Sequence, residues 1–209
     1  MKVNRELFNV VSLLVGCLIW LAGCSAPVET YAERIENCLA NATLIEFDVE
    51  GSDRKGFSHD VEPECLIGVT LPEFEGTDLA GNPIGPGNIR GKVNVINFWF
   101  TTCKPCIAEI PSLNALAKKY DGGGVNFLAI ARDSADRVNT FLDEHPFDFT
   151  IIPNGKDLIA DGFQLMWGYP FTMITDRNNT LVGTIRAGQH SPELAVKEIE
   201  SVLVRYLGQ

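Results

Sequence analysis

Two cysteines separated by two residues form the segment Cys103-Lys104-Pro105-Cys106. The apolar run Val93–Phe100 precedes the pair, and a stretch with helical spacing, Ile107–Tyr120, follows it. A cysteine at a helix N-terminus meets unpaired backbone N–H groups and the positive end of the helix dipole, and both stabilise a thiolate. We therefore expect Cys103 to be the reactive thiol. Cys106, one turn into the helix, would be near enough to attack a mixed disulfide on Cys103.

The chemistry expected of such a pair is thiol-disulfide exchange. The Cys103 thiolate attacks a substrate disulfide, and Cys106 then attacks Cys103, which releases the reduced substrate and joins the two cysteines. Pro105 suits a helix start because its φ is fixed and it has no N–H to satisfy. A Cys-x-x-Cys segment is also half of a zinc site, but such a site needs two further ligands at similar spacing. Neither the other cysteines nor the three histidines provide that spacing, so no metal is expected.

The composition limits the other possibilities. The chain has 209 residues, of which 45% are hydrophobic, so one ordinary domain with extensions is expected. The net charge of −10 argues against nucleic acid as a partner.

The N-terminus has the features of a bacterial export signal. A short positive region is followed by the apolar run Val10–Leu21, which is too short for a relaxed membrane span. The run ends in Leu21-Ala22-Gly23-Cys24, which resembles the lipobox of bacterial lipoproteins, where the cysteine is lipidated and the chain is cut before it. The alternative is an uncleaved anchor with a chance cysteine. We expect a signal peptide over residues 1–23, an anchor or linker over 24–65, and a folded domain over 66–209 held in the cell envelope by lipid on Cys24.

Cys38 and Cys65 form a second candidate pair. In an oxidising compartment an isolated pair tends to form a disulfide. A bridge closing this loop would stabilise the fold by about 3 kcal/mol on the chain-entropy account. Two separate buried thiols are the alternative.

Strands alternate with helices along the rest of the chain, which predicts an α/β fold. The nearly continuous apolar run Val93–Trp99 suits a central strand covered on both faces. Two late strands are close enough for a hairpin, so a mixed sheet is expected. The other expected elements are helices at Tyr31–Leu39, Ser134–His145 and Asp157–Met166, a last helix opened by Ser191-Pro192-Glu193, loops at Gly51–Glu64 and Gly85–Gly91, early hairpin strands at Leu71–Phe74 and Asp78–Ile84, and strands at Val125–Ala131, Thr150–Ile152, Thr172–Thr175 and Leu181–Arg186.

These features together resemble the thioredoxin superfamily, and more closely its TlpA/ResA-type membrane-anchored thiol-disulfide oxidoreductases. The resemblance covers roughly residues 65–207. It implies a thioredoxin-like fold, with a central mixed β-sheet flanked by helices and an N-terminal β-hairpin extension, and it implies no cofactor. The residues that carry it are Gly91–Trp99, Cys103–Cys106, Glu109, Pro111, Gly168-Tyr169-Pro170 and Phe171–Asp176.

The resemblance also assigns roles around the cysteines. It implies that Pro170 is a cis proline facing the pair, and that the backbone at Tyr169 binds a substrate strand; related proteins commonly have threonine there. It implies that Glu109 assists proton transfer, although a solvated helix glutamate is the simpler reading. The acid familiar from thioredoxin would fall at Asn97, which cannot titrate. Thr102 replaces a common tryptophan, which would leave the site less covered.

The favoured function is reduction of disulfides in exported proteins, for example in cytochrome c maturation, with electrons from a membrane donor of the DsbD/CcdA type. A peroxiredoxin-like thiol peroxidase is the alternative, although its Pro-x-x-x-Thr-x-x-Cys pattern is not met before Cys103. A copper chaperone of the Sco type fits less well, because it needs three residues between the cysteines and a histidine where Tyr169-Pro170 stands.

Overall fold

The computed structural model describes residues 28–48, 55–186 and 191–208. The expected signal peptide, the lipobox and Cys24 lie outside these residues. Within the described ranges, none of the helices is both long enough and apolar enough to cross a bilayer.

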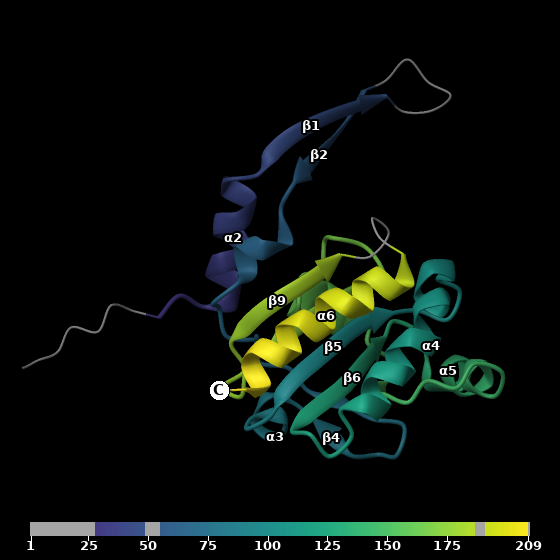
Figure 1. Ribbon diagram of the computed structural model, residues 1–209. Helices are drawn as coiled ribbons and strands as arrows, with labels where there is room; N and C mark the ends of the chain where they lie inside the picture. Colours follow the sequence, from purple (N-terminus) through teal and green to yellow (C-terminus); the bar gives the residue numbers. More distant parts are fainter. Residues whose placement is uncertain (1–27, 49–54, 187–190, 209) are drawn as a thin grey trace, which may run out of the picture.

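A mixed five-stranded sheet forms the centre of the domain (Figure 1). Its order is β7-β6-β5-β8-β9. The β5 strand pairs in parallel with β6 and antiparallel with β8, and β6 and β7 are parallel, whereas β8 and β9 are antiparallel. The expected mixed sheet is therefore confirmed. The strands are β5 (Val93–Trp99), β6 (Val125–Ala131), β7 (Thr150–Ile152), β8 (Phe171–Thr175) and β9 (Leu181–Arg186).

The central strand β5 is buried along its whole length, as its composition predicts. Alternate side chains enter two different cores: Val95 and Trp99 pack on one face of the sheet, and Ile96 and Phe98 pack on the other. A strand that is apolar on both faces therefore needs a covering layer on each side.

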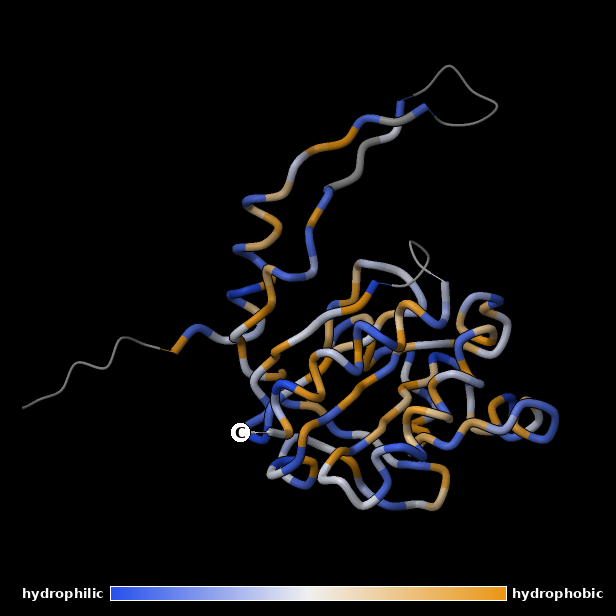
Figure 2. The backbone as a smooth tube through the Cα atoms, in the orientation of Figure 1, coloured by the Kyte–Doolittle hydropathy of each residue, from blue (hydrophilic) through white to orange (hydrophobic). Residues whose placement is uncertain are grey.

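Helices α4 (Lys104–Lys119), α5 (Ala135–Leu142) and α6 (Pro192–Leu207) supply one of these layers. In Figure 1, α6 and α4 lie side by side over the sheet. The Ser191 side chain accepts a hydrogen bond from the N–H of Leu194, which caps α6 as expected. Figure 2 shows the corresponding pattern: hydrophobic residues gather on the inner strands, and hydrophilic residues lie at the periphery.

The second layer comes largely from the N-terminal part of the chain. Helix α2 (Tyr31–Ala40) forms as expected, and Tyr31 and Ile35 are buried against the sheet. A long hairpin follows α2 and projects away from the domain in Figure 1. Its strands are β1 (Thr43–Asp48) and β2 (Lys55–Asp60). The rest of the second layer consists of the 3-10 helix η1 (Pro63–Leu66), strands β3 (Gly76–Thr77) and β4 (Pro83–Ile84), helix α3 (Pro86–Ile89), and the π-helical turn η2 (Leu158–Gly162).

Four local predictions were wrong. The expected loop over Gly51–Glu64 contains β2, which the ladder with β1 holds in strand geometry. The early hairpin exists, but its first strand is Gly76–Thr77 rather than Leu71–Phe74. Helical structure in Asp157–Met166 is limited to η2, and the loop after β4 contains the short helix α3.

Candidate active site

The two cysteines of the Cys-x-x-Cys segment lie where β5 passes into α4. Cys103 is the N-cap of α4 and is joined to Cys106 by a disulfide, with their Cα atoms 5.2 Å apart. The N–H of Cys106 points at Cys103 Sγ at 3.3 Å, and the N–H of Ile107 donates to the Cys103 carbonyl at 3.0 Å. Helix N–H groups directed at a sulfur favour its thiolate form when the disulfide is reduced.

Both sulfur-bearing residues are largely covered. Cys103 is 4% exposed and Cys106 is 3% exposed. Thr102 is exposed, so the absence of a tryptophan there leaves that position open while the sulfurs remain shielded by their other neighbours.

A contact that the sequence does not reveal fixes the loop before the cysteines. The carboxylate of Asp133 accepts a hydrogen bond from the N–H of buried Thr101 at 2.6 Å. The next residue back along the chain, Arg132, donates its N–H to the Trp99 carbonyl at 3.0 Å. The end of β6 therefore holds the loop that presents the cysteines. The only available signal was that β5 and β6 are parallel, so their carboxyl ends meet at one edge.

The Tyr169-Pro170 bond is cis. Pairing of Phe98 with Phe171 places Pro170 just beyond the paired end of the sheet, at the end where β5 leads to the cysteines. The Tyr169 ring meets the Phe100 ring edge-on, with centroids 5.2 Å apart. The structure therefore brings these two segments, distant in the chain, to the same end of the sheet.

An exposed cation borders the same surface. The Arg132 guanidinium lies 5.8 Å from the centroid of the Phe100 ring. Burial raises the pKa of the Tyr169 hydroxyl, and the positive charge of Arg132 partly opposes that rise. Arg132 and Phe100 are therefore neighbours of the site that the motif analysis did not identify.

Glu109 lies one helical turn after Cys106, on the same side of α4. Its side chain is 5% exposed, so it is not the solvated glutamate of the simpler reading. Burial raises the pKa of this carboxyl from 4.5 to about 7. Glu109 is thus able to accept or release a proton near neutral pH. Asn97, the position of the thioredoxin acid, is buried and donates to the Thr172 hydroxyl at 3.0 Å.

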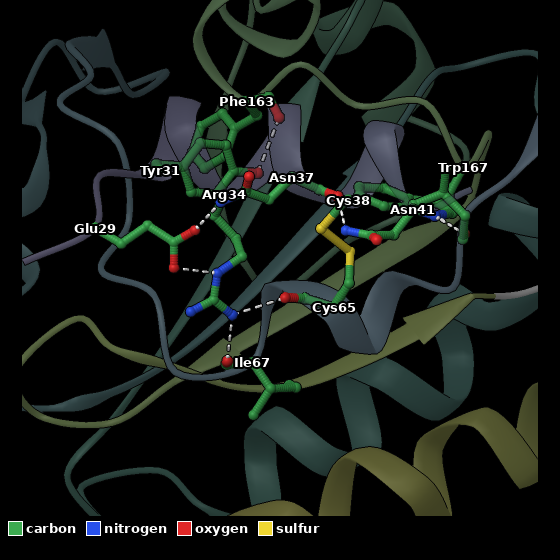
Figure 3. The surroundings of a disulfide bond; sticks show 11 residues. Glu29, Tyr31, Arg34, Asn37, Cys38, Asn41, Cys65, Ile67, Phe163 and Trp167 are labelled. Carbon is green, nitrogen blue, oxygen red and sulfur yellow. Dashed lines mark hydrogen bonds and ion pairs between the residues drawn. A yellow bond between two sulfur atoms is a disulfide. The ribbon is translucent and has the colours of Figure 1, made fainter.

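The other cysteine pair belongs to a different region. Cys38 at the end of α2 and Cys65 in η1 are joined by a disulfide, with Cα atoms 5.9 Å apart (Figure 3). Across the ranges that the structure describes, no cluster of three or more histidine, cysteine, aspartate or glutamate side chains is arranged to hold a metal ion.

A disulfide-bonded cysteine pair at the start of the helix after the central strand, at the same end of the sheet as a cis X-Pro bond that opens an antiparallel strand, is the arrangement of a thiol-disulfide oxidoreductase with a thioredoxin-like fold. The profile of the AhpC/TSA family matches residues 67–184. The chain is 33% identical over 196 residues to the thiol-disulfide oxidoreductase ResA of Bacillus thuringiensis, covering 93% of this chain and 95% of that protein. The chain therefore belongs to the AhpC/TSA family and is a ResA-like thiol-disulfide oxidoreductase.

Solved structures agree with the fold. A candidate thiol:disulfide interchange protein DsbE from Chlorobium tepidum superposes with a TM-score of 0.59 at 23% identity, covering 68% of this chain and 98% of the other. A candidate thiol-disulfide oxidoreductase from Bacteroides vulgatus gives a TM-score of 0.58 at 27% identity, covering 69% and 99% respectively. The thioredoxin-like fold is confirmed, and about a third of this chain lies outside each superposition.

Proposed function

We propose that this protein reduces disulfides in exported proteins through a dithiol mechanism at Cys103 and Cys106, while held in the cell envelope by lipid on Cys24. The observation that carries the proposal is the position of Cys103 at the N-cap of α4, bonded to Cys106, which lies one turn before the buried acid Glu109. A thiolate, a resolving thiol and a group able to hold a proton are the parts that exchange requires.

The reaction starts from the reduced pair. The Cys103 thiolate attacks one sulfur of the client disulfide, forms a mixed disulfide and expels the other client sulfur as a thiolate, which takes up a proton. Cys106 loses its proton, attacks Cys103 Sγ and expels the second client sulfur. Two electrons pass to the client, both of its thiolates take up protons, one supplied by Cys106 and one by solvent, and the Cys103–Cys106 disulfide remains. A membrane dithiol donor of the DsbD/CcdA type would then return two electrons by the reverse exchange.

Two neighbours support this sequence of steps. Glu109 accepts the proton that Cys106 loses, because its pKa of about 7 leaves much of its carboxylate available at neutral pH. Backbone groups at Tyr169 and Pro170, at the same end of the sheet as the cysteines, bind the client segment as an added strand. Cytochrome c apoproteins with Cys-x-x-Cys-His sites are the clients we propose.

Cysteine substitutions test the mechanism. Cys103→Ala should abolish reduction of a model disulfide peptide, and Cys106→Ala should accumulate mixed disulfides that are visible on a non-reducing gel. The double variant Cys38→Ser/Cys65→Ser, which removes the other disulfide, should still reduce a small aromatic disulfide. Full turnover by Cys106→Ala would refute the two-thiol mechanism.

Two further measurements test the alternatives. Hydrogen peroxide consumption much faster than disulfide reduction would favour a thiol peroxidase. Mass spectrometry of the mature protein should find acyl chains on Cys24, and an intact Met1 would overturn the lipid anchor. Titration against glutathione buffers would then fix the direction of electron flow through the reduction potential.

A further inference from the structure

Residues 163–167, which precede Tyr169 and Pro170, are hydrogen-bonded to the N-terminal part of the chain. The Tyr31 hydroxyl of α2 donates a hydrogen bond to the Phe163 carbonyl at 2.9 Å. The Trp167 indole N–H donates to the Val61 carbonyl at 2.5 Å. Residues more than a hundred positions apart in the chain therefore fix both ends of a five-residue stretch.

The aromatic rings of residues 163–167 are buried and pack against other aromatic rings. Phe163 is fully buried, and its ring meets the rings of Tyr31, Phe74 and Phe98 with centroids 4.9 to 6.5 Å apart. Trp167 is 6% exposed and stacks on Phe171, the first residue of β8, at 5.3 Å with an interplanar angle of 13°. The position of Trp167 is therefore coupled to the start of the strand that Pro170 precedes.

A clamp of α2 and η1 fixes the groups that make these contacts. The Cys38–Cys65 disulfide joins the end of α2 to η1 (Figure 3). The Arg34 side chain of α2 also contacts η1 and its surroundings. Its guanidinium donates to the carbonyls of Cys65 and Ile67 at 2.8 and 3.0 Å, and it pairs with Glu29 at 2.7 Å. The disulfide and Arg34 together hold η1, and with it the nearby Val61 carbonyl that accepts from the indole.

We propose that the clamp of α2 and η1 is a positioning element of the active site, which sets the place of the Tyr169-Pro170 backbone through Tyr31, Val61 and Trp167. This inference rests on the proposed function and extends it to the choice of substrate. An extended polypeptide that pairs with backbone at Tyr169 needs this edge in place, whereas a small disulfide that touches only the sulfurs does not. One of the bonds that hold the clamp together is the Cys38–Cys65 disulfide. Reducing it should therefore weaken peptide binding without removing the reactive thiols of Cys103 and Cys106.

Rates with two kinds of substrate test the clamp. For Tyr31→Phe and for Cys38→Ser/Cys65→Ser, the second-order rate with an extended disulfide peptide should fall, by about tenfold in the double variant. The rate with a small aromatic disulfide should stay within about twofold. The loss should appear in KM for the peptide, as expected for a binding edge that has moved. An equal change with both substrates would overturn the proposal.

A matched control separates positioning from loss of stability. Ile199→Ala removes a buried side chain from α6 on the opposite face of the sheet. Its melting temperature should fall, but its ratio of peptide to small-disulfide rates should remain that of the wild type. If Ile199→Ala reproduces the changed ratio, the clamp has no specific role. Tyr31→Phe removes a single hydroxyl, so it remains informative if the double serine variant fails to fold.

Hydrogen exchange makes failure of the clamp distinguishable from failure of the proposed function. Amides of residues 164–169 should exchange faster in Tyr31→Phe than in the wild type, whatever reaction the protein catalyses. Unchanged exchange there would overturn the clamp, even if disulfide reduction through Cys103 is established. Faster exchange in a protein that reduces no disulfide would leave the clamp standing and refute the function.

Discussion

Replacing Glu109 by glutamine should make the protein more stable at alkaline pH. The Glu109 carboxyl is 5% exposed, and burial raises its pKa from 4.5 to about 7. A group with a raised pKa in the folded state contributes stability while it is protonated, below about pH 4.5, and this contribution is lost as the pH rises through 7. One pKa unit corresponds to about 1.4 kcal/mol, so the wild type should lose about 3 kcal/mol across this window.

Glutamine keeps the shape and polarity of the protonated acid but cannot ionise. The free energies of unfolding of the oxidised wild type and Glu109→Gln should therefore agree near pH 4.5 and diverge above it, with the variant more stable by up to about 3 kcal/mol at pH 8. Urea unfolding at several pH values measures this difference directly, provided that the m-values agree.

Glu33→Gln is the matched control for this experiment. A hydrogen bond from the Thr30 backbone N–H lowers the pKa of Glu33, so its titration falls below the window tested. Its stability profile should therefore run parallel to that of the wild type between pH 5 and 8. If Glu109→Gln also runs parallel, the buried carboxyl does not titrate near neutrality, and the reasoning about its proton fails. The stabilised variant should also exchange disulfides at least about tenfold more slowly at neutral pH, because it lacks the proton acceptor.

Two further predictions concern the supports of the site. Asp133→Ala leaves the buried Thr101 N–H without its acceptor and should lower the free energy of unfolding by about 1–3 kcal/mol, whereas Asp133→Asn should cost less, as urea unfolding would measure. Gly155→Ala would place a Cβ 2.6 Å from an Ile130 methyl and should cost about 1–3 kcal/mol in the same assay. Gly87→Ala, where nothing lies within 4 Å, should not destabilise.

The sequence predicted those parts of the fold in which local pattern and tertiary environment agree. The run Val93–Trp99 is apolar enough to require burial on both faces, and every one of its residues is buried. The helix signals at Ser191 and Pro192 are likewise local, because they satisfy N–H groups of the same turn. The strand Lys55–Asp60 carries no such signal, since it belongs to a two-stranded ribbon that projects from the domain and its register is set by β1 (Figure 1).

Within the site, the sequence identified residues whose type is required by chemistry but not those that hold them. The spacing of the two cysteines and the proline far along the chain can be read directly from the sequence. The hydrogen bond from Thr101 to Asp133 and the bond from Tyr31 to Phe163 depend on which chain segments meet after folding. An aspartate after a strand or a tyrosine in a helix has many ordinary uses, so neither could be singled out beforehand.

The buried polar groups near the cysteines differ in their ability to take up a thiol proton during the proposed disulfide exchange. Asn97 lies in the central strand, and its amide is engaged with the Thr172 hydroxyl, so it offers no ionisable group. Glu109 lies on the helix that Cys103 begins, is buried to a similar degree, and has a pKa near 7. An acid on α4 keeps a fixed helical relation to Cys106, because both side chains belong to one rigid element. In the proposed mechanism, Cys106 rather than Cys103 is therefore the cysteine whose proton Glu109 is best placed to take.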